Sequence, residues 1–217
     1  GCIPSKALLH AAKILTETAE AEEMGIAFAQ PKVDLAKLRL WVEKQTIKRL
    51  TGGLSSLAKQ RKVNILQGKA EFATAHELNV TKPDGDIVKV AFTNAIIAVG
   101  SRPVQLPFLP DDPRIMDSTK ALLLEDLPKD LLVIGGGIIG MELGTVYAAL
   151  GSKVSVVELT DSILPGADKD LTLPLLKRMQ QHFSKIMLNT KVVQVEAKKD
   201  GLYVTFAGAG VENKPVR

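Results

Sequence analysis

The chain has 217 residues and a formal net charge of +4, and its hydrophobic content of 46% is ordinary for a globular α/β protein. Its basic residues are interspersed with 24 acidic ones rather than gathered into a stripe, so we expect a solvated surface and no nucleic-acid partner. The sequence has no run of 18 apolar residues, which argues against a membrane span. Its single cysteine cannot form an internal disulfide, so we expect a reducing, cytoplasmic location.

The first residues predict a helix that begins at the only cysteine. Pro4 suits the start of a helix, and apolar residues follow at helical spacing to about Glu23, before Gly25 ends the pattern. Cys2 therefore lies at or just before the helix N-terminus, where exposed N–H groups and the helix dipole stabilise a thiolate. The residue types alone leave two interpretations open: a reactive sulfur, or a small buried apolar side chain.

A second helical pattern and a group of short strands follow. The helix begins with Asp34 as its N-cap and continues to about Leu57, weakened by Gly52 and Gly53. We expect four short strands next, over residues 63–66, 71–73, 78–81 and 87–92. The apolar run 95–99 predicts a buried strand, and the proline-rich residues 106–113 mark a rigid connection between domains.

Residues 131–151 predict a strand, turn and helix that bind a dinucleotide. Four apolar residues form a short buried strand, and the turn has the pattern Gly135-x-Gly137-x-x-Gly140 before a helix over residues 138–150. Gly135 allows the tight turn, Gly137 lets a pyrophosphate approach the helix N-terminus, and Gly140 lets the helix pack close to the strand. The rest of this cofactor-binding loop consists of Gly136, Ile138 and Ile139. Closely packed turns also produce this pattern, so its context matters.

The context is a second strand, residues 154–158, that ends on Glu158, 18 residues after Gly140. A carboxylate at that point accepts hydrogen bonds from the ribose hydroxyls and repels a 2′-phosphate. The sequence has no arginine between Arg114 and Arg178 that would bind such a phosphate, so we expect NAD rather than NADP. The remaining elements are a helix over 168–183, with Pro174 in its first two turns, and strands at 186–188, 192–195 and 202–206.

These motifs together resemble those of the pyridine nucleotide-disulfide oxidoreductases. Residues 1–6, Gly-Cys-Ile-Pro-Ser-Lys, are similar to the second half of the family's redox-active disulfide motif, and residues 95–103 to the strand and turn that close its flavin domain. Residues 51–53 and 164–170, with the cysteine motif, are most similar to the bacterial dihydrolipoamide dehydrogenase branch.

The resemblance covers the whole chain and implies an α/β fold. It implies two Rossmann-like three-layer nucleotide-binding domains, both incomplete, with antiparallel β-meander insertions. Residues 1–105 would be the remainder of an FAD-binding domain and residues 106–217 an NAD-binding domain. Since the family's first dinucleotide fingerprint has no counterpart in the sequence, we interpret the chain as an internal part of such an enzyme.

The resemblance also implies roles for individual residues. Cys2 matches the flavin-side sulfur of the disulfide, whose partner cysteine in the family lies five residues upstream. Lys6 and Glu142 match two positions that meet near the flavin, where a cation stabilises electron density on the reduced ring. By residue type alone, each could instead be a surface charge or part of a structural ion pair. Three further positions match backbone contacts to the flavin or to the adenine of NAD: Ala70, Gly100 and Val192.

The function that the resemblance implies is oxidation of dihydrolipoamide through a disulfide, with FAD and NAD as cofactors and no metal. The substrate would be carried on the lipoyl domains of 2-oxoacid dehydrogenase complexes, and the enzyme would be a homodimer. None of His10, His76 and His182 matches the family's acid-base motif, so we assign no acid-base catalyst among them and expect this chain by itself to be inactive. We also expect it not to retain FAD, because the family's first fingerprint, which binds the flavin pyrophosphate, has no counterpart in the sequence. The alternatives are another flavoprotein disulfide reductase, a transhydrogenase, or an NAD-binding module without catalysis.

Overall fold

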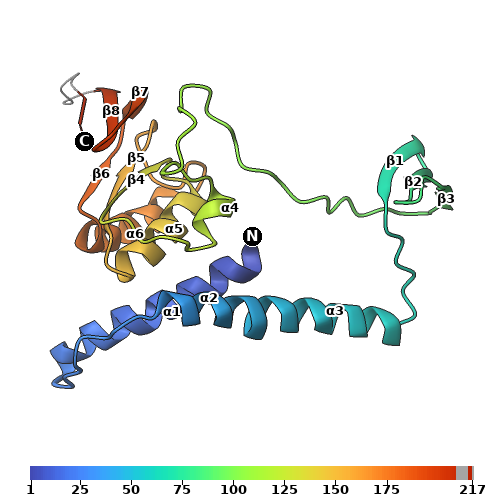
Figure 1. Ribbon diagram of the computed structural model, residues 1–217, viewed down its shortest axis with the longest axis horizontal. Helices are drawn as coiled ribbons and strands as arrows, with labels where there is room; N and C mark the ends of the chain where they lie inside the picture. The colour runs from blue at the N-terminus through green and yellow to red at the C-terminus, as the bar shows by residue number, and fades with distance from the viewer. Residues whose placement is uncertain (209–214, 217) are drawn as a thin grey trace. The chain divides into compact units, whose positions relative to one another are not determined.

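The computed structural model describes residues 1–208, 215 and 216. The chain has a mixed α/β fold and divides into two compact units (Figure 1). Unit 1 comprises residues 1–47 and 103–217 and contains a parallel sheet and a β-hairpin; unit 2 comprises residues 48–102 and contains a helix and an antiparallel sheet. The two units are defined by contacts within the chain and not by which nucleotide each part binds. The predicted division into an FAD-binding part and an NAD-binding part at residue 105 therefore stays a prediction.

Helix α1 (Cys2–Glu20) begins at the cysteine, as the sequence predicts. Gly1 is its N-cap, and the N–H of Ser5 donates to the Gly1 carbonyl at 3.1 Å. The helix continues as a 3₁₀ turn, η1 (Ala21–Met24), and ends at Gly25, whose φ of 81° is left-handed. Glycine adopts this conformation without the steric cost that a Cβ imposes, which explains why the helix ends there.

The second helical segment begins at the predicted cap. Asp34 accepts a hydrogen bond from the N–H of Lys37 at 3.0 Å and starts α2 (Leu35–Trp41). A π-helical stretch, η2 (Val42–Lys48), and α3 (Arg49–Gln60) follow directly. Gly52 and Gly53 do not interrupt α3, so the predicted weakening near them does not end the helix.

The centre of unit 1 is a three-stranded parallel sheet with strand order β4-β5-β6. Helices α5 and α6 connect its strands, as Figure 1 shows. The elements are β4 (Asp130–Ile134), α5 (Ile138–Ala149), β5 (Lys153–Val157), α6 (Lys169–His182) and β6 (Lys185–Met187). This alternation of parallel strands and helices is one mononucleotide-binding half of a Rossmann fold. It confirms the order of strands and helices predicted from residue 131 onward.

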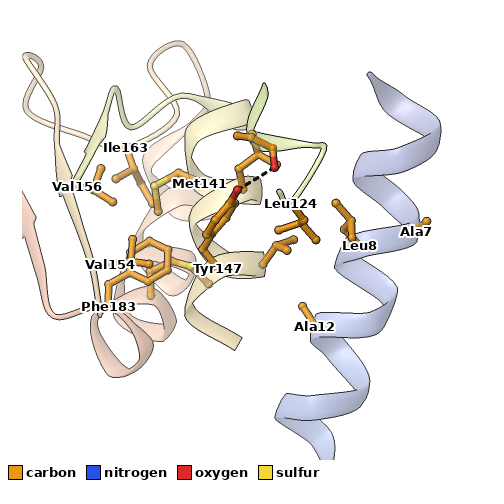
Figure 2. Packing of buried hydrophobic residues seen from close by; sticks show 14 of the residues in the cluster. Ala7, Leu8, Ala12, Leu124, Met141, Tyr147, Val154, Val156, Ile163 and Phe183 are labelled. Atoms are coloured by element: carbon orange, nitrogen blue, oxygen red, sulfur yellow. Dashed lines mark hydrogen bonds between the residues drawn. The ribbon is translucent and has the colours of Figure 1, made fainter. Parts of the chain in front are cut away.

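Helix α1 packs against α5, and their side chains share one hydrophobic core with the parallel sheet (Figure 2). Leu8 of α1 is buried beside Leu124, on the side where Tyr147 of α5 lies. The Tyr147 hydroxyl donates to the Ala121 carbonyl at 2.9 Å, so its one polar group is satisfied. Burial of such side chains contributes about 1.5–3 kcal/mol each, and therefore fixes the cysteine helix to the helix that follows the glycine turn.

Unit 1 also contains a short helix and a β-hairpin. The helix is α4 (Ser118–Ala121), and the hairpin consists of β7 (Thr190–Lys198) and β8 (Gly201–Gly208), which pair antiparallel with a bulge between Val192 and Gln194. Both strands are longer than predicted. Buried side chains of the hairpin pack with Val157 at the end of β5. The hairpin is thereby joined to the carboxyl end of the parallel sheet.

Unit 2 contains an antiparallel meander with strand order β1-β2-β3. The strands are β1 (Lys69–Thr74), β2 (Glu77–Thr81) and β3 (Ile87–Ala91). The turn between β2 and β3 is closed by Lys82, whose N–H donates to the Asp86 carbonyl at 2.8 Å, and it includes Gly85 at a φ of 90°. The predicted antiparallel meander is confirmed.

Two predicted strands are wrong. Residues 63–66 and 95–99 form no strand, and within the latter Ile96 and Val99 are 94% and 89% exposed. A strand persists only when a neighbour satisfies its backbone groups, and in the described part of unit 2 neither segment belongs to the sheet.

Among the helices that the structure describes, none combines the length and the apolar character needed to cross a bilayer.

Candidate functional site

The glycine turn between β4 and α5 is fixed by backbone contacts. Gly135 has a φ of 110°, and its N–H donates to the Val157 carbonyl of β5 at 2.8 Å. A Cβ on Gly140 would lie 2.2 Å from the carbonyl oxygen of Gly135 and 3.1 Å from Cγ1 of Val133. Because the first distance is far below any van der Waals contact, only glycine lets α5 pack this closely against β4. The roles predicted for Gly135 and Gly140 in the turn agree with this geometry.

The N-terminus of α5 is open. Gly137 is its N-cap, and none of the described side chains caps it with a hydrogen bond. The first N–H groups of a helix lack partners within the helix and carry the positive end of the helix dipole. Ile138 and Ile139 in this first turn are exposed, although both are apolar. The arrangement can therefore bind an anionic group such as a pyrophosphate through backbone N–H groups.

Glu158 follows β5 directly and is held by hydrogen bonds. Glu158 is buried, with only 7% of the residue exposed. Oε2 accepts the N–H of Gly136 at 2.7 Å, and Oε1 accepts both the N–H and the hydroxyl of Thr160 at 2.8 Å. Burial raises the pKa of Glu158, but these hydrogen bonds outweigh it, and the pKa lies below its ordinary value. The carboxylate is therefore ionised at neutral pH.

The packing of α1 on α5 joins two charged residues far apart in the sequence. The Lys6 ammonium forms an ion pair with Oε1 of Glu142, and the Ser5 hydroxyl donates to Oε2 at 2.8 Å. Burial raises the pKa of Glu142, but the hydrogen bonds from Lys6 and Ser5 outweigh it, so the pKa is lowered. The Lys6 side chain is 65% exposed and that of Glu142 27%, so the pair lies at the surface of unit 1.

Cys2 is the first residue of α1, and its thiol is free and exposed. The interpretation of Cys2 as a small buried side chain is therefore wrong. It lies one helical turn before Lys6, on the helix that carries the ion pair with Glu142. Its reactivity and its place in a disulfide stay predictions.

The three positions predicted to contact cofactors through their backbones lie in different elements. Val192 is buried in β7 and pairs with Phe206 of β8. In unit 2, Ala70 pairs with Val80 in the β1–β2 ladder, and Gly100 has a φ of 76° in a segment without regular structure. These contacts remain predictions. Within the described residues, no three His, Cys, Asp or Glu side chains gather as metal ligands would.

Sequence reasoning missed three interactions of this site. The Gly136 N–H, predicted to be part of the cofactor loop, donates to Glu158 instead. Ser5 and Thr160, for which we predicted no role, donate hydroxyl hydrogen bonds to Glu142 and Glu158, respectively. Thr160 could have been found, because a threonine two residues after an acid often donates to it locally. Ser5 could not, since its partner lies 137 residues away.

Comparison with known proteins places this geometry in context. The model of the family described as "Pyridine nucleotide-disulphide oxidoreductase" matches residues 1–214. Two curated relatives, both named dihydrolipoyl dehydrogenase, come from Haemophilus influenzae and Vibrio cholerae, and each is 53% identical over 209 residues. A relative of the same name from Geobacillus stearothermophilus is 42% identical over 211 residues.

These alignments cover 96% to 97% of this chain but only 43% to 44% of the relatives, so the chain spans about two-fifths of their length. Among solved structures, LpdA from Mycobacterium tuberculosis superposes with a TM-score of 0.78 at 25% identity, covering 95% of this chain and 45% of that one. A cysteine-to-serine mutant of the HOCl-induced flavoprotein disulfide reductase RclA from Escherichia coli, as a Cu(II) complex, superposes with a TM-score of 0.72 at 26% identity, covering 95% of this chain and 43% of that one.

Proposed function

We propose, from the premise that this chain belongs to the pyridine nucleotide-disulphide oxidoreductase family, that it is part of a dihydrolipoamide dehydrogenase. The observation that carries the proposal is the packing of the cysteine helix α1 on α5, the helix that follows the glycine turn. The ion pair of Lys6 with Glu142 joins these two helices. The overall reaction oxidises dihydrolipoamide to lipoamide and reduces NAD⁺ to NADH with release of one proton. Bound FAD and NAD supply the two-electron chemistry.

The geometry of the glycine turn supports NAD as the nucleotide. The open N-terminus of α5, at Gly137, Ile138 and Ile139, would hold the pyrophosphate through its N–H groups. The ionised Glu158 would accept a ribose hydroxyl and repel a 2′-phosphate. Val192 would contribute a backbone contact to the adenine. The missing Cβ at Gly140 leaves the room that this tight turn requires.

The residues of α1 would serve the sulfur and the flavin. Cys2, the first residue of α1, would be the flavin-side sulfur of the disulfide. Lys6, held by Glu142, would present a cation toward the flavin, and Ala70 and Gly100 would contribute backbone contacts. Because the sequence has a single cysteine, the sulfur that exchanges with substrate is not among residues 1–217.

The same proposal includes the division of the chain and its partners. Residues 1–105 would belong to the FAD-binding domain and residues 106–217 to the NAD-binding domain. The substrate would be the dihydrolipoamide of lipoyl domains in cytoplasmic 2-oxoacid dehydrogenase complexes, and the enzyme would act as a homodimer. The relatives of the same name at up to 53% identity support this substrate over that of other disulfide reductases.

The test is a steady-state assay of the full-length protein. Reduced lipoamide is offered with NAD⁺ or NADP⁺, and glutathione disulfide with NADH or NADPH serves as the competing reaction. We expect NAD⁺-dependent oxidation of dihydrolipoamide to dominate. Preferred reduction of glutathione disulfide would support a different disulfide reductase, and NADH binding without turnover of either substrate would support a nucleotide-binding module.

A further inference from the structure

Glu158 uses most of its hydrogen-bonding capacity within the protein. A carboxylate offers about four lone-pair positions. The N–H of Gly136 donates to Oε2, the N–H and hydroxyl of Thr160 donate to Oε1, and the backbone of Leu159 contributes a further hydrogen bond to the carboxylate. With the residue only 7% exposed, the side chain has little freedom to rotate. Its orientation is therefore set before any ligand arrives.

Gly136 makes room for this arrangement. A Cβ built on Gly136 would lie 3.1 Å from Cβ and 3.2 Å from Cγ of Glu158, closer than ordinary van der Waals contacts. The φ of Gly136 is not in the left-handed region, so the backbone conformation itself would accept a Cβ, and the neighbour that a Cβ would push by a few tenths of an ångström is the Glu158 side chain. The Gly136 carbonyl also accepts the N–H of Leu164 at 2.8 Å, so the peptide that follows the one donating to Glu158 is anchored as well.

Thr160 is anchored in the same way. Its carbonyl accepts the N–H of Asn189, the residue before β7, at 2.8 Å. Its hydroxyl lies 2.8 Å from Oε1 of Glu158 and 2.9 Å from the Ser162 carbonyl. The backbone N–H of Thr160 donates to Glu158 regardless of the side chain at this position, whereas the hydroxyl is specific to threonine or serine.

We propose that Gly136 and Thr160 are positioning residues for nucleotide specificity, which fix the Glu158 carboxylate so that Oε2 accepts one ribose hydroxyl and the charge cannot turn away from a 2′-phosphate. To admit a 2′-phosphate, Glu158 must rotate and give up its hydrogen bonds to both residues. The inference rests on the proposed NAD site and adds the residues that enforce its preference for NADH over NADPH.

The experiment measures the dissociation constants of NADH and NADPH for variants of the full-length protein by isothermal titration calorimetry. We expect Gly136→Ala to lower the preference for NADH by about 10-fold, because the added Cβ moves the Glu158 carboxylate away from the N–H of residue 136. Thr160→Val, which preserves shape and the backbone N–H, is expected to lower it by about 3-fold. Thr160→Ser keeps the hydroxyl and should keep the preference.

Thr145→Val is the matched control, since among the described residues the partners of the Thr145 hydroxyl are the Met141 carbonyl and the Met179 sulfur, and neither Gly136 nor Glu158 is among them. It should leave the preference unchanged. Circular dichroism and the melting midpoint show whether each variant folds, and if Gly136→Ala does not, Thr160→Val decides. Glu158→Gln tests the proposed nucleotide site itself, separately from the positioning of its carboxylate.

If Glu158→Gln lowers the preference while Gly136→Ala and Thr160→Val do not, the positioning role is wrong and the NAD site stands. If Glu158→Gln has no effect, or NADH does not bind, the proposed nucleotide site is wrong and this inference with it. A preference lowered in both variants and kept in Thr160→Ser supports the role, because a general loss of stability would weaken the binding of both nucleotides equally.

Discussion

Unit 1 contains two carboxylates, Glu158 and Glu142, that are held in different ways. The donors to Glu158 are uncharged and come from residues within 22 positions of it in the sequence. The donors to Glu142 come from α1, 136 and 137 positions away, and one of them is the cation of Lys6. The first arrangement forms with the βαβ unit itself, whereas the second requires α1 to pack on α5.

The difference separates two tasks of the proposed enzyme. In that proposal, the Glu158 region would be a preformed nucleotide site built on a local turn, and its task would be recognition. The Glu142 region places the cysteine helix and a cation beside α5, and its proposed task would be electron transfer. Changes in the Glu142 region should therefore affect turnover without affecting nucleotide preference. Changes in the Glu158 region should affect nucleotide preference and leave electron transfer intact.

The largest effect is expected from Cys2→Ser in the full-length protein. A serine hydroxyl cannot form the proposed disulfide or a thiolate, so oxidation of dihydrolipoamide should fall below detection. The long-wavelength charge-transfer absorbance of the two-electron-reduced enzyme should disappear, while NADH affinity and bound FAD are retained. Stopped-flow absorbance and NADH titration check this. Turnover close to that of the wild type would mean that the exposed sulfur has no redox role.

Glu158→Arg tests the other region. It replaces a ribose acceptor by a partner for phosphate, so NADH binding should weaken by about 10-fold to 100-fold and NADPH binding should improve. Asp161→Arg, three residues further on and exposed, is the charge-matched control and should leave the preference unchanged. Equal changes in both variants, measured as dissociation constants, would attribute the effect to net charge alone.

Gly140→Ala should reduce stability rather than specificity. The added Cβ would meet the Gly135 carbonyl oxygen at 2.2 Å, and this contact can be relieved only by a shift of the backbone. We expect a loss of about 1–3 kcal/mol in the free energy of unfolding. In α3, Gly52→Ala is the control, since nothing lies within 4 Å and alanine favours helices by about 0.5–1 kcal/mol. A Gly140→Ala variant as stable as the wild type would contradict the close packing of α5 on β4.

The comparison of the two regions also explains what the sequence could predict. The strand, glycine turn and helix around Gly135 were predicted to within one or two residues, because their signals are local: an apolar run, glycine spacing and Gly151 as a stop. The run 95–99 has an equally strong apolar signal, but a strand also needs neighbours, and the prediction of a buried strand there is wrong.

Contacts between residues far apart in the sequence were harder to predict. No pattern within the sequence connects Lys6 with Glu142, and only the resemblance to a family suggested that they meet. The Ser5 hydroxyl had no signal at all, since serine in the first turn of a helix is common for local reasons. The hydrogen bond of Gly136 to Glu158 was hidden because the fingerprint leaves position 136 unspecified, so that Gly136 was interpreted only as part of the cofactor-binding loop.

The smallest predicted effect concerns Ser5→Ala. The hydroxyl is one of two side-chain donors that lower the pKa of Glu142 below its ordinary value, against the opposing effect of burial. A carboxyl whose pKa is lowered on folding stabilises the protein above its unfolded pKa of about 4.5, and this contribution is lost as the pH falls through the folded pKa. At pH 7 we expect Ser5→Ala to lose about 0.5–1.5 kcal/mol.

This loss should shrink on acidification below pH 4.5, because protonation of Glu142 removes the charge that the Ser5 hydroxyl stabilises. Urea unfolding at pH 7 and at pH 3.5 measures the difference, and Ser5→Thr, which keeps a hydroxyl, should behave as the wild type. Lys6 is 65% exposed, so its pair with Glu142 is screened by water, and the Ser5 hydrogen bond should be at least as important for holding the carboxylate. A loss independent of pH would assign Ser5 to helix capping instead, and the Glu142 region would then depend on packing of α1 alone.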